Sequence, residues 1–214
     1  MRKECLIFDF DGVIANTDQS RFKNLSEILQ RYNIHLPPDY FNKLVGLTTV
    51  AFLKKYFPFL PEEQVKNISK ERQENYYSNL AKYCIPFEGM KNTIDELSNH
   101  FKIVMVTSNA REKVITQLKH LNVYQYFDWI IGREDTENNK LEKSYLKVPS
   151  IIDKDPEKCI VIEDSEIGVQ AAKEADFYCI KFVPLSTNDS NHTAHNDIAR
   201  NYPELKKKIL NFLE

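Results

Sequence analysis

Two carboxylates, Asp9 and Asp11, stand two residues apart at the end of an apolar run that starts at Cys5. Side chains alternate along an extended strand, so both carboxylates would point to the same side. In that position one carboxylate can attack as a nucleophile while the other transfers a proton. Gly12 follows them and can turn the chain. The alternative is an acidic cap at a strand-to-loop junction, because a bare Asp-x-Asp-Gly pattern often arises by chance.

Further polar groups end two later apolar runs. Thr107, Ser108 and Asn109 end the second run, and Glu163 and Asp164 end the fourth. A Thr-Ser-Asn sequence also suits the N-cap of an ordinary helix, and two acids suit the first turn of one. Because a helix N-terminus attracts anions, capping and anion binding are compatible at the first of these positions.

Helical patterns separate most of five short β-rich runs along the chain. This alternation predicts an α/β fold with a Rossmann-like parallel sheet, whose strands are buried on both faces. Ligands of such sheets bind beyond the carboxyl ends of the strands, where the polar groups described above are expected. A polar, turn-rich surface loop and a docking helix should complete the chain. The expected elements are the strands Cys5–Phe10, Lys102–Thr107, Trp129–Gly132, Cys159–Ile162 and Tyr178–Phe182, the loop Ser186–Asn196 and the helix Pro203–Glu214.

The connection after the first strand is far longer than an ordinary crossover, at roughly 70 to 80 residues. Helical spacing recurs in it, with breaks at prolines and a glycine. We therefore expect a small all-helical domain over residues 17–85, inserted into a core formed by residues 1–16 and 86–214. Both ends of the insert join the core beside the carboxyl end of the first strand, so it is expected to act as a hinged cap. Its expected helices are Ser20–Tyr32, Phe41–Val45, Val50–Phe57 and Glu62–Tyr83.

Composition excludes several classes of protein. The net charge is −2, with 29 basic and 31 acidic residues, so no general field attracts nucleic acid or an anionic membrane. No run of 18 apolar residues occurs, which excludes a membrane-spanning helix. The first residues lack the long apolar stretch of a secretion signal, so a cytoplasmic location is expected. Four widely spaced cysteines are expected to be reduced core thiols.

The run Asp9-Phe10-Asp11-Gly12-Val13 resembles the first motif of the phosphotransferases of the haloacid dehalogenase superfamily. In that family the first Asp is the nucleophile that forms an aspartyl-phosphate, and the second protonates the leaving alcohol and then activates water. The resemblance implies these roles for Asp9 and Asp11. Dehalogenases proper lack the second Asp, so Asp11 favours phosphoryl transfer. The likeness extends from residue 4 to about residue 182, and it fits the branch of β-phosphoglucomutase-like and phosphoglycolate phosphatase-like proteins, which carry an inserted helical cap.

The same resemblance implies groups that bind the transferring phosphoryl group. Thr107 would be the main one, assisted by Ser108 and Asn109. The family also has a lysine after the third strand, usually followed by proline, which offsets charge among the carboxylates and the phosphate. Lys140 and Lys143 are the candidates for this position, and both lack the proline. The spacing favours Lys140.

The run from Glu163 to residue 172 resembles the final, metal-binding motif of the family. Asp164, Asp9 and the backbone carbonyl of Asp11 would bind Mg²⁺, a hard cation that prefers oxygen ligands, and Glu163 would serve through water. Gly168 is small, which we interpret as room for the following helix to approach the sheet.

These observations predict a magnesium-dependent phosphatase that acts on a small phosphorylated metabolite. Mutases of this branch place a His in the first cap helix and a basic residue after a Gly-x-Ser segment. Here Arg21 and Thr49 stand at those positions, which weakens the mutase alternative. Arg21 and Arg72 can contact an anionic substrate, but we interpret each as an exposed helix charge. A non-catalytic protein that binds a phosphorylated ligand on the same fold is a third alternative, and the intact set of acids argues against it.

Overall fold

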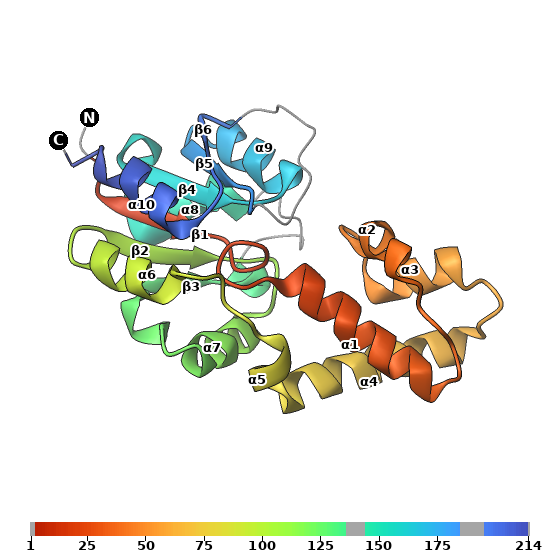
Figure 1. Cartoon of the computed structure of the whole chain (residues 1–214). Coiled ribbons are helices and arrows are strands. Elements are labelled where there is room, and N and C mark those ends of the chain that lie inside the picture. Colours follow the sequence, from red (N-terminus) through yellow and green to blue (C-terminus); the bar gives the residue numbers. More distant parts are fainter. Residues whose placement is uncertain (1–2, 136–143, 185–194, 214) are drawn as a thin grey trace. The chain divides into compact units, whose positions relative to one another are not determined.

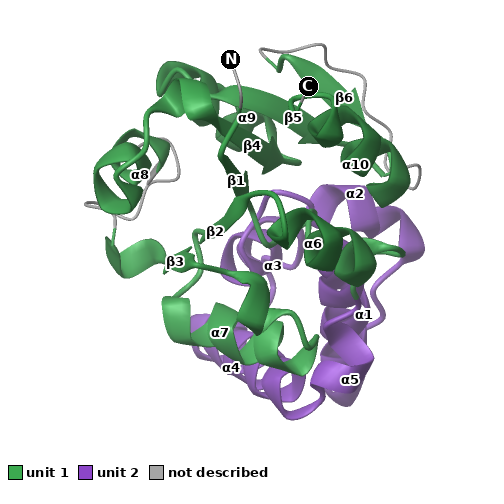
Figure 2. Cartoon of the chain, turned by 90° about the vertical axis from the view of Figure 1, so that its left-hand side faces the viewer, with its two compact units in different colours: residues 1–15, 86–214 green, residues 16–85 purple. Residues whose placement is uncertain are grey.

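The computed structural model describes residues 3–135, 144–184 and 195–213. The chain divides into two compact units, an α/β unit formed by Met1–Ala15 and Pro86–Glu214 and a helical unit formed by Asn16–Ile85 (Figure 2). The helical unit begins one residue before the range 17–85 expected from the sequence. Within the described ranges, no helix has the length and apolarity needed to cross a membrane.

The α/β unit is built on a six-stranded sheet in the order β3-β2-β1-β4-β5-β6, and every adjacent pair is parallel (Figure 1). The first strand lies in the middle, where Cys5 aligns with Lys102 on one side and with Cys159 on the other. All residues of β1 and β4 are buried, as expected for a parallel sheet covered on both faces. The strands are β1 Cys5–Phe8, β2 Lys102–Val106, β3 Trp129–Ile131, β4 Cys159–Glu163, β5 Tyr178–Phe182 and β6 Asp197–Ala199.

Helices lie on both faces of this sheet. Lys181 of β5 forms an ion pair with Glu166 of α9, whereas the next residue, Phe182, contacts Tyr202 of α10. Because side chains alternate along a strand, α9 and α10 lie on opposite faces. Helix α8 contacts α9, and α6 contacts α10. The described α-helices of the unit are α6 Met90–Ser98, α7 Arg111–His120, α8 Ser144–Ile152, α9 Glu166–Glu174 and α10 Tyr202–Leu210, and its short 3-10 helices are η2 Tyr124–Tyr126, η3 Arg133–Asp135 and η6 Pro156–Lys158.

Strand β6 was not among the five strands that the sequence predicts. It occupies three residues between the predicted surface loop and the predicted C-terminal helix. The side chain of Asn196 accepts a hydrogen bond from the N–H of Cys179, and its own N–H donates to the Cys179 carbonyl. The strand therefore depends on pairing with β5, which the short sequence Asp-Ile-Ala does not indicate.

The helical unit has its own apolar core, to which Leu25, Ile28, Phe52 and Ile68 contribute. One predicted helix, Glu62–Tyr83, is wrong as a single element, because Asn79 separates two helices. The Asn79 side chain donates to the carbonyl of Asn75, and this local hydrogen bond competes with the helical pattern. The elements are α1 Thr17–Arg31, η1 Pro38–Tyr40, α2 Phe41–Leu44, α3 Thr49–Tyr56, α4 Glu62–Ser78 and α5 Leu80–Tyr83.

The loop after β1 is tied down from two sides within the α/β unit. The buried Tyr202 hydroxyl of α10 donates a hydrogen bond of 2.9 Å to the carbonyl of Val13. The N–H of Phe87 donates to the carbonyl of Ile14 at 3.3 Å. The loop thus has a defined path although it is not part of a helix or strand.

Candidate active site

Three neighbouring strands bring the predicted site residues to one edge of the sheet. Asp9 and Asp11 follow β1, Thr107 follows β2, and Glu163 ends β4. Because β1 lies between β2 and β4 and all three are parallel, their carboxyl ends share this edge. The N–H of Asp9 donates to the carbonyl of Ile162 at 3.0 Å, which fixes the start of the β1 loop against β4.

Three carboxylates converge at this edge. One oxygen from each of Asp9, Glu163 and Asp164 lies within 4.8 Å of the others, and the first two side chains are buried. Burial raises the pKa of Asp9 well above its ordinary value, and the neighbouring charges of Glu163, Asp11 and Asp164 raise it further. A group of oxygen ligands that repel one another in this way suits a hard divalent cation, which would offset their charge. Asp11 does not contribute a side-chain oxygen to the cluster.

Both oxygens of Glu163 are held by the protein. One accepts hydrogen bonds from the N–H and the hydroxyl of Ser165, at 3.0 and 3.1 Å. The other accepts from the hydroxyl of Tyr145 at 3.3 Å. These bonds oppose the rise that burial causes in the pKa of Glu163. Glu163 is thus oriented by the protein before any ligand binds.

Gly168 leaves room for the Glu163 carboxylate. A Cβ on Gly168 would lie only 1.9 Å from an oxygen of Glu163. Gly168 thus lets the start of α9 approach the end of β4, as its small size suggests, and the Glu163 carboxylate fills the space that it leaves. The side chain of Ser165 caps α9 by accepting from the Gly168 N–H, so the two acids are not the cap of this helix.

Gly12 likewise leaves room for the side chain of Asp164. Its φ is +72°, and a Cβ there would lie 1.9 Å from an Asp164 oxygen. Two requirements, a left-handed backbone and a close approach, therefore coincide at this residue.

The residues after β2 orient Asp11. The side-chain amide of Asn109 donates a hydrogen bond of 2.6 Å to the Asp11 carboxylate. Thr107 is buried, and its hydroxyl oxygen accepts from the N–H of Asn109 at 3.1 Å. Ser108 is exposed. The N-cap of α7 is Ala110, without a side-chain hydrogen bond, so the Thr-Ser-Asn sequence does not cap this helix.

The family model described as haloacid dehalogenase-like hydrolase matches residues 6–182, which is most of the chain. The chain belongs to this family. The resemblance seen in the motifs is thereby confirmed, and with it the assignment of the chain as an enzyme.

Several relatives of this hydrolase are named phosphatases. The phosphorylated carbohydrates phosphatase of Thermotoga maritima is 28% identical over 196 residues, which cover 87% of this chain and 88% of the relative. The phosphoglycolate phosphatase of Aquifex aeolicus is 25% identical over 173 residues, which cover 79% of this chain and 80% of the relative.

Solved structures confirm the predicted fold class of the hydrolase. A putative phosphatase from Clostridium difficile superposes with a TM-score of 0.80 at 19% identity, over 98% of this chain and 99% of the other. A putative β-phosphoglucomutase from Thermotoga maritima gives a TM-score of 0.78 at 23% identity, over 98% of each chain.

A second group of residues links the segments that follow β2 and β3 in the hydrolase. Arg111, which begins α7, forms an ion pair with Asp135, and the same carboxylate accepts from the N–H of Gly132 at 2.8 Å. The N–H of Arg133 donates to the Asn109 carbonyl at 2.9 Å. These contacts fix the segment that carries Asn109.

Sequence reasoning missed the parts played by Tyr145, Ser165 and Arg111. Ser165 carried a signal, because a serine three residues before Gly168 at the start of a helix is a typical N-cap. No pattern in the sequence indicates the contacts of Tyr145 or Arg111. Lys140 and Lys143, the two candidates for the family lysine, lie outside the described residues.

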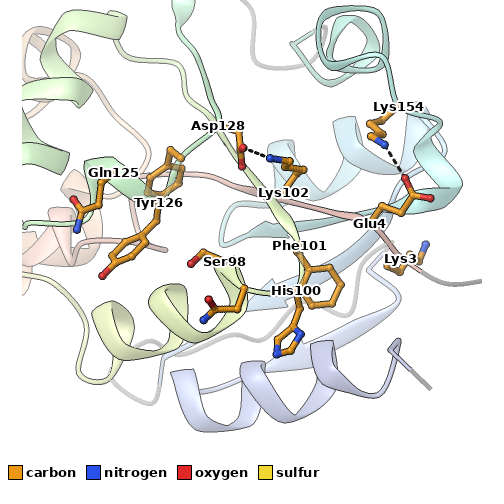
Figure 3. A pocket seen from close by; sticks show the side chains of 12 residues that line it. Lys3, Glu4, Ser98, His100, Phe101, Lys102, Gln125, Tyr126, Asp128 and Lys154 are labelled. Atoms are coloured by element: carbon orange, nitrogen blue, oxygen red, sulfur yellow. Dashed lines mark hydrogen bonds and ion pairs between the residues drawn. The ribbon is translucent and has the colours of Figure 1, made fainter.

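The hydrolase also has a polar pocket of 740 Å³ at the opposite edge of the sheet, near the starts of β1 and β2 (Figure 3). Four of its charged side chains form ion pairs, Lys102 with Asp128 and Lys154 with Glu4, each at 2.7 Å. Ligands of such sheets bind at the carboxyl ends, so we assign this pocket no part in catalysis.

Proposed function

We propose that this hydrolase is a magnesium-dependent phosphatase that cleaves a small phosphomonoester through an aspartyl-phosphate on Asp9. The observation that carries the proposal is the convergence of Asp9, Glu163 and Asp164 beside an Asp11 that Asn109 orients. The phosphatase relatives support the reaction class. The expected cytoplasmic location remains a prediction.

The metal site would use oxygen ligands of this chain. Asp9, Asp164 and the backbone carbonyl of Asp11 would hold Mg²⁺ directly. Glu163 would act through water, because its oxygens already accept hydrogen bonds from Ser165 and Tyr145. When bound, the cation neutralises charge on the phosphoryl oxygens and lets the Asp9 carboxylate approach them.

The proposed chemistry has two steps. A carboxylate oxygen of Asp9 attacks phosphorus, the ester P–O bond breaks, and Asp11 donates its proton to the leaving oxygen. Asp11 then accepts a proton from water, the water oxygen attacks phosphorus, and the bond to Asp9 breaks. Inorganic phosphate leaves, and Asp9 is restored. The Asn109 hydrogen bond would keep Asp11 aimed at the oxygen that gains or loses the proton.

The phosphoryl group would be bound from the β2 side. Thr107 is buried next to this edge and would donate its hydroxyl proton, with Ser108 and Asn109 beside it. Lys140 would supply the positive charge. The helical unit, residues 17–85 in the sequence-based expectation, would serve as the cap that selects a phosphorylated sugar or acid.

A sugar-phosphate mutase is the alternative within the same family, and a non-catalytic phospho-ligand binding protein is the alternative from another class. Thr49, at the position where mutases carry a basic residue, is buried in the helical unit. Thr49 offers no cation for a second phosphate, which favours hydrolysis over the mutase reaction, in which the phosphoryl group passes to another sugar hydroxyl.

The proposal is tested by phosphate release from a panel of small phosphomonoesters with Mg²⁺. Release that Asp9→Asn and EDTA both abolish would support it. Isomerisation of glucose 1-phosphate without net release would favour the mutase. No turnover of any substrate, together with retained binding of phosphorylated ligands, would favour the binding protein.

A further inference from the structure

Helix α7 begins at Arg111 without a side-chain cap of its own, because Ala110 stands at its N-cap. Two acids of η3, in the segment after β3, take that place. A carboxylate oxygen of Glu134 accepts from the Arg111 N–H at 2.9 Å. Asp135 binds the Arg111 side chain through both of its carboxylate oxygens, one of which lies 3.1 Å from Nε. The first residue of α7 is therefore held by η3 rather than by the residues that precede it.

The same two segments also touch at their backbones. A Cβ on Gly132 would lie 2.7 Å from the Arg111 nitrogen and 2.9 Å from its Cα, distances that real Cβ atoms essentially never show. Its φ is not in the left-handed region, so glycine is needed here for space. The Gly132 N–H donates to Asp135 at 2.8 Å, and the carboxylate that binds Arg111 thus also holds its own segment. We name Arg111, Gly132, Glu134 and Asp135 the β3–α7 clamp.

The β3–α7 clamp is linked to Asp11 through one residue. Asn109 stands two residues before Arg111, and its carbonyl accepts from the N–H of Arg133 at 2.9 Å. Its side-chain amide donates to the Asp11 carboxylate at 2.6 Å. The backbone of Asn109 is therefore bonded to the clamp segment, and its side chain to Asp11. A shift of the start of α7 would move the donor that orients Asp11.

The exposure of the ion pair indicates that its effect is geometric. The side chains of Arg111 and Asp135 are 43% and 22% exposed. Ion pairs this accessible to water contribute little to stability. A guanidinium and a carboxylate that meet through two parallel contacts nevertheless fix one another in orientation. Asp135 therefore restrains the start of α7 more than it stabilises the fold.

We propose that Asp135 and Gly132 are positioning residues for Asp11, which they orient through Arg111 and Asn109. The proposal rests on the proposed phosphatase function, in which Asp11 protonates the leaving oxygen. An acid must lie within hydrogen-bond reach of the oxygen that it protonates, so its orientation affects the rate. Because the clamp acts on Asp11 only through Asn109, its effect should appear where protonation by Asp11 limits the rate.

Esters with different leaving groups test this selectivity. p-Nitrophenolate leaves without a proton, whereas an alkoxide needs one from Asp11. The ratio kcat/KM covers the steps up to departure of the leaving group, so the later attack of water does not enter it. Asp135→Ala should lower kcat/KM by about 5- to 20-fold for the best alkyl phosphate of the panel, and by less than about twofold for p-nitrophenyl phosphate. Partial unfolding would lower both equally.

Asp128→Ala is the matched control in the same unit. Asp128 also combines an ion pair, to Lys102 at 2.7 Å, with a backbone hydrogen bond, from the N–H of Ile103 at 2.9 Å. It lies at the opposite edge of the sheet, so its kcat/KM should equal that of wild type for both esters.

A double-mutant cycle tests the route through Asn109. The variant that combines Asn109→Ala with Asp135→Ala should be no slower than Asn109→Ala alone on the alkyl phosphate, because residues that act through one another do not add. Additive losses would overturn the proposal. Wild-type kinetics of Asp135→Ala on both esters, or an equal loss on both, would also overturn it.

An NMR measurement decides the structural link without turnover. The side-chain amide signals of Asn109 are assigned by their loss in Asn109→Ala, and Asp11→Ala shows where they lie without the bond to Asp11. In Asp135→Ala they should move toward those positions, and in Asp128→Ala they should stay as in wild type. Unmoved signals in Asp135→Ala would overturn the proposal.

The two measurements separate this proposal from the proposed function. If wild type hydrolyses no ester but the Asn109 signals move in Asp135→Ala, the proposed function fails and the link from the clamp to Asp11 stands. If Asp135→Ala does not fold, Arg111→Ala replaces it in both measurements, because it breaks the same ion pair and keeps the bond between Asp135 and Gly132.

Discussion

Replacing Gly12 by Ala is expected to disable the acidic cluster at a modest loss of stability. A Cβ at this position would lie 1.9 Å from Asp164 Oδ2, where contacts under 3.0 Å essentially never occur. The carboxylate must therefore move by about 1 Å, and a misplacement of that size costs roughly 100-fold in rate. The left-handed backbone adds a loss of about 1–2 kcal/mol in the free energy of unfolding.

Gly89 is the matched control in the same unit. Its φ is +78°, close to that of Gly12, but a Cβ there would meet Tyr202 at an ordinary 3.4 Å. Urea unfolding should show a loss of about 1–2 kcal/mol in both Ala variants. Only Gly12→Ala should lose Mg²⁺-dependent phosphate release, by roughly 100-fold, and Mg²⁺ affinity by calorimetry. Equal activity of the two variants would refute the idea that Gly12 makes room for Asp164.

Three further perturbations address the same edge of the sheet. Asn109→Ala removes the hydrogen bond to Asp11, so kcat should fall by roughly 10- to 100-fold with little change in KM; an unchanged kcat in steady-state kinetics would contradict this. Ser165→Ala removes a helix cap and the hydroxyl hydrogen bond to Glu163, while the bond from its N–H remains, so the free energy of unfolding should fall by about 1 kcal/mol and Mg²⁺ affinity by roughly 10- to 100-fold. Denaturant unfolding and calorimetry test these values, and wild-type affinity would speak against the role of Ser165. The raised pKa of Asp9 means that the metal-free folded state holds a proton that the unfolded state has lost, so stability should decline as pH rises from about 4 through that raised pKa. In EDTA, Asp9→Asn should therefore lose less Tm than wild type between pH 5 and pH 8, and equal losses would show that Asp9 is not the titrating group.

The sequence predicts the strands better than their ends. Five apolar runs mark five of the strands, because residues buried on both faces of a sheet must be apolar whatever their neighbours are. The predicted strand Cys5–Phe10 is two residues too long, because β1 ends at Phe8. Residue composition does not show where the pairing between strands ends. Strand β6 depends on its pairing with β5, and the break at Asn79 is accompanied by a local side-chain hydrogen bond, and no periodic pattern records either.

For the site, spacing indicates which strand ends carry polar groups but not how those groups contact one another. Parallel strands share an edge, so Asp9, Thr107 and Glu163 could be expected near one another. The hydroxyl of Tyr145 reaches Glu163 from a helix 18 residues away in sequence. Such a contact depends on how α8 packs against the sheet, which is a property of the folded core.

The hydrogen bond from Tyr202 to the carbonyl of Val13 has a consequence for biosynthesis. Strand β1 is translated first but pairs with strands that begin at Lys102 and Cys159. At about 5–20 residues per second, a ribosome needs roughly 10–40 s to proceed from the first strand to the last helix. The loop that carries Asp9 and Asp11 therefore gains the Tyr202 hydrogen bond only after that helix has been synthesised. A nascent or truncated chain that lacks it would display the acidic residues without the geometry to use them.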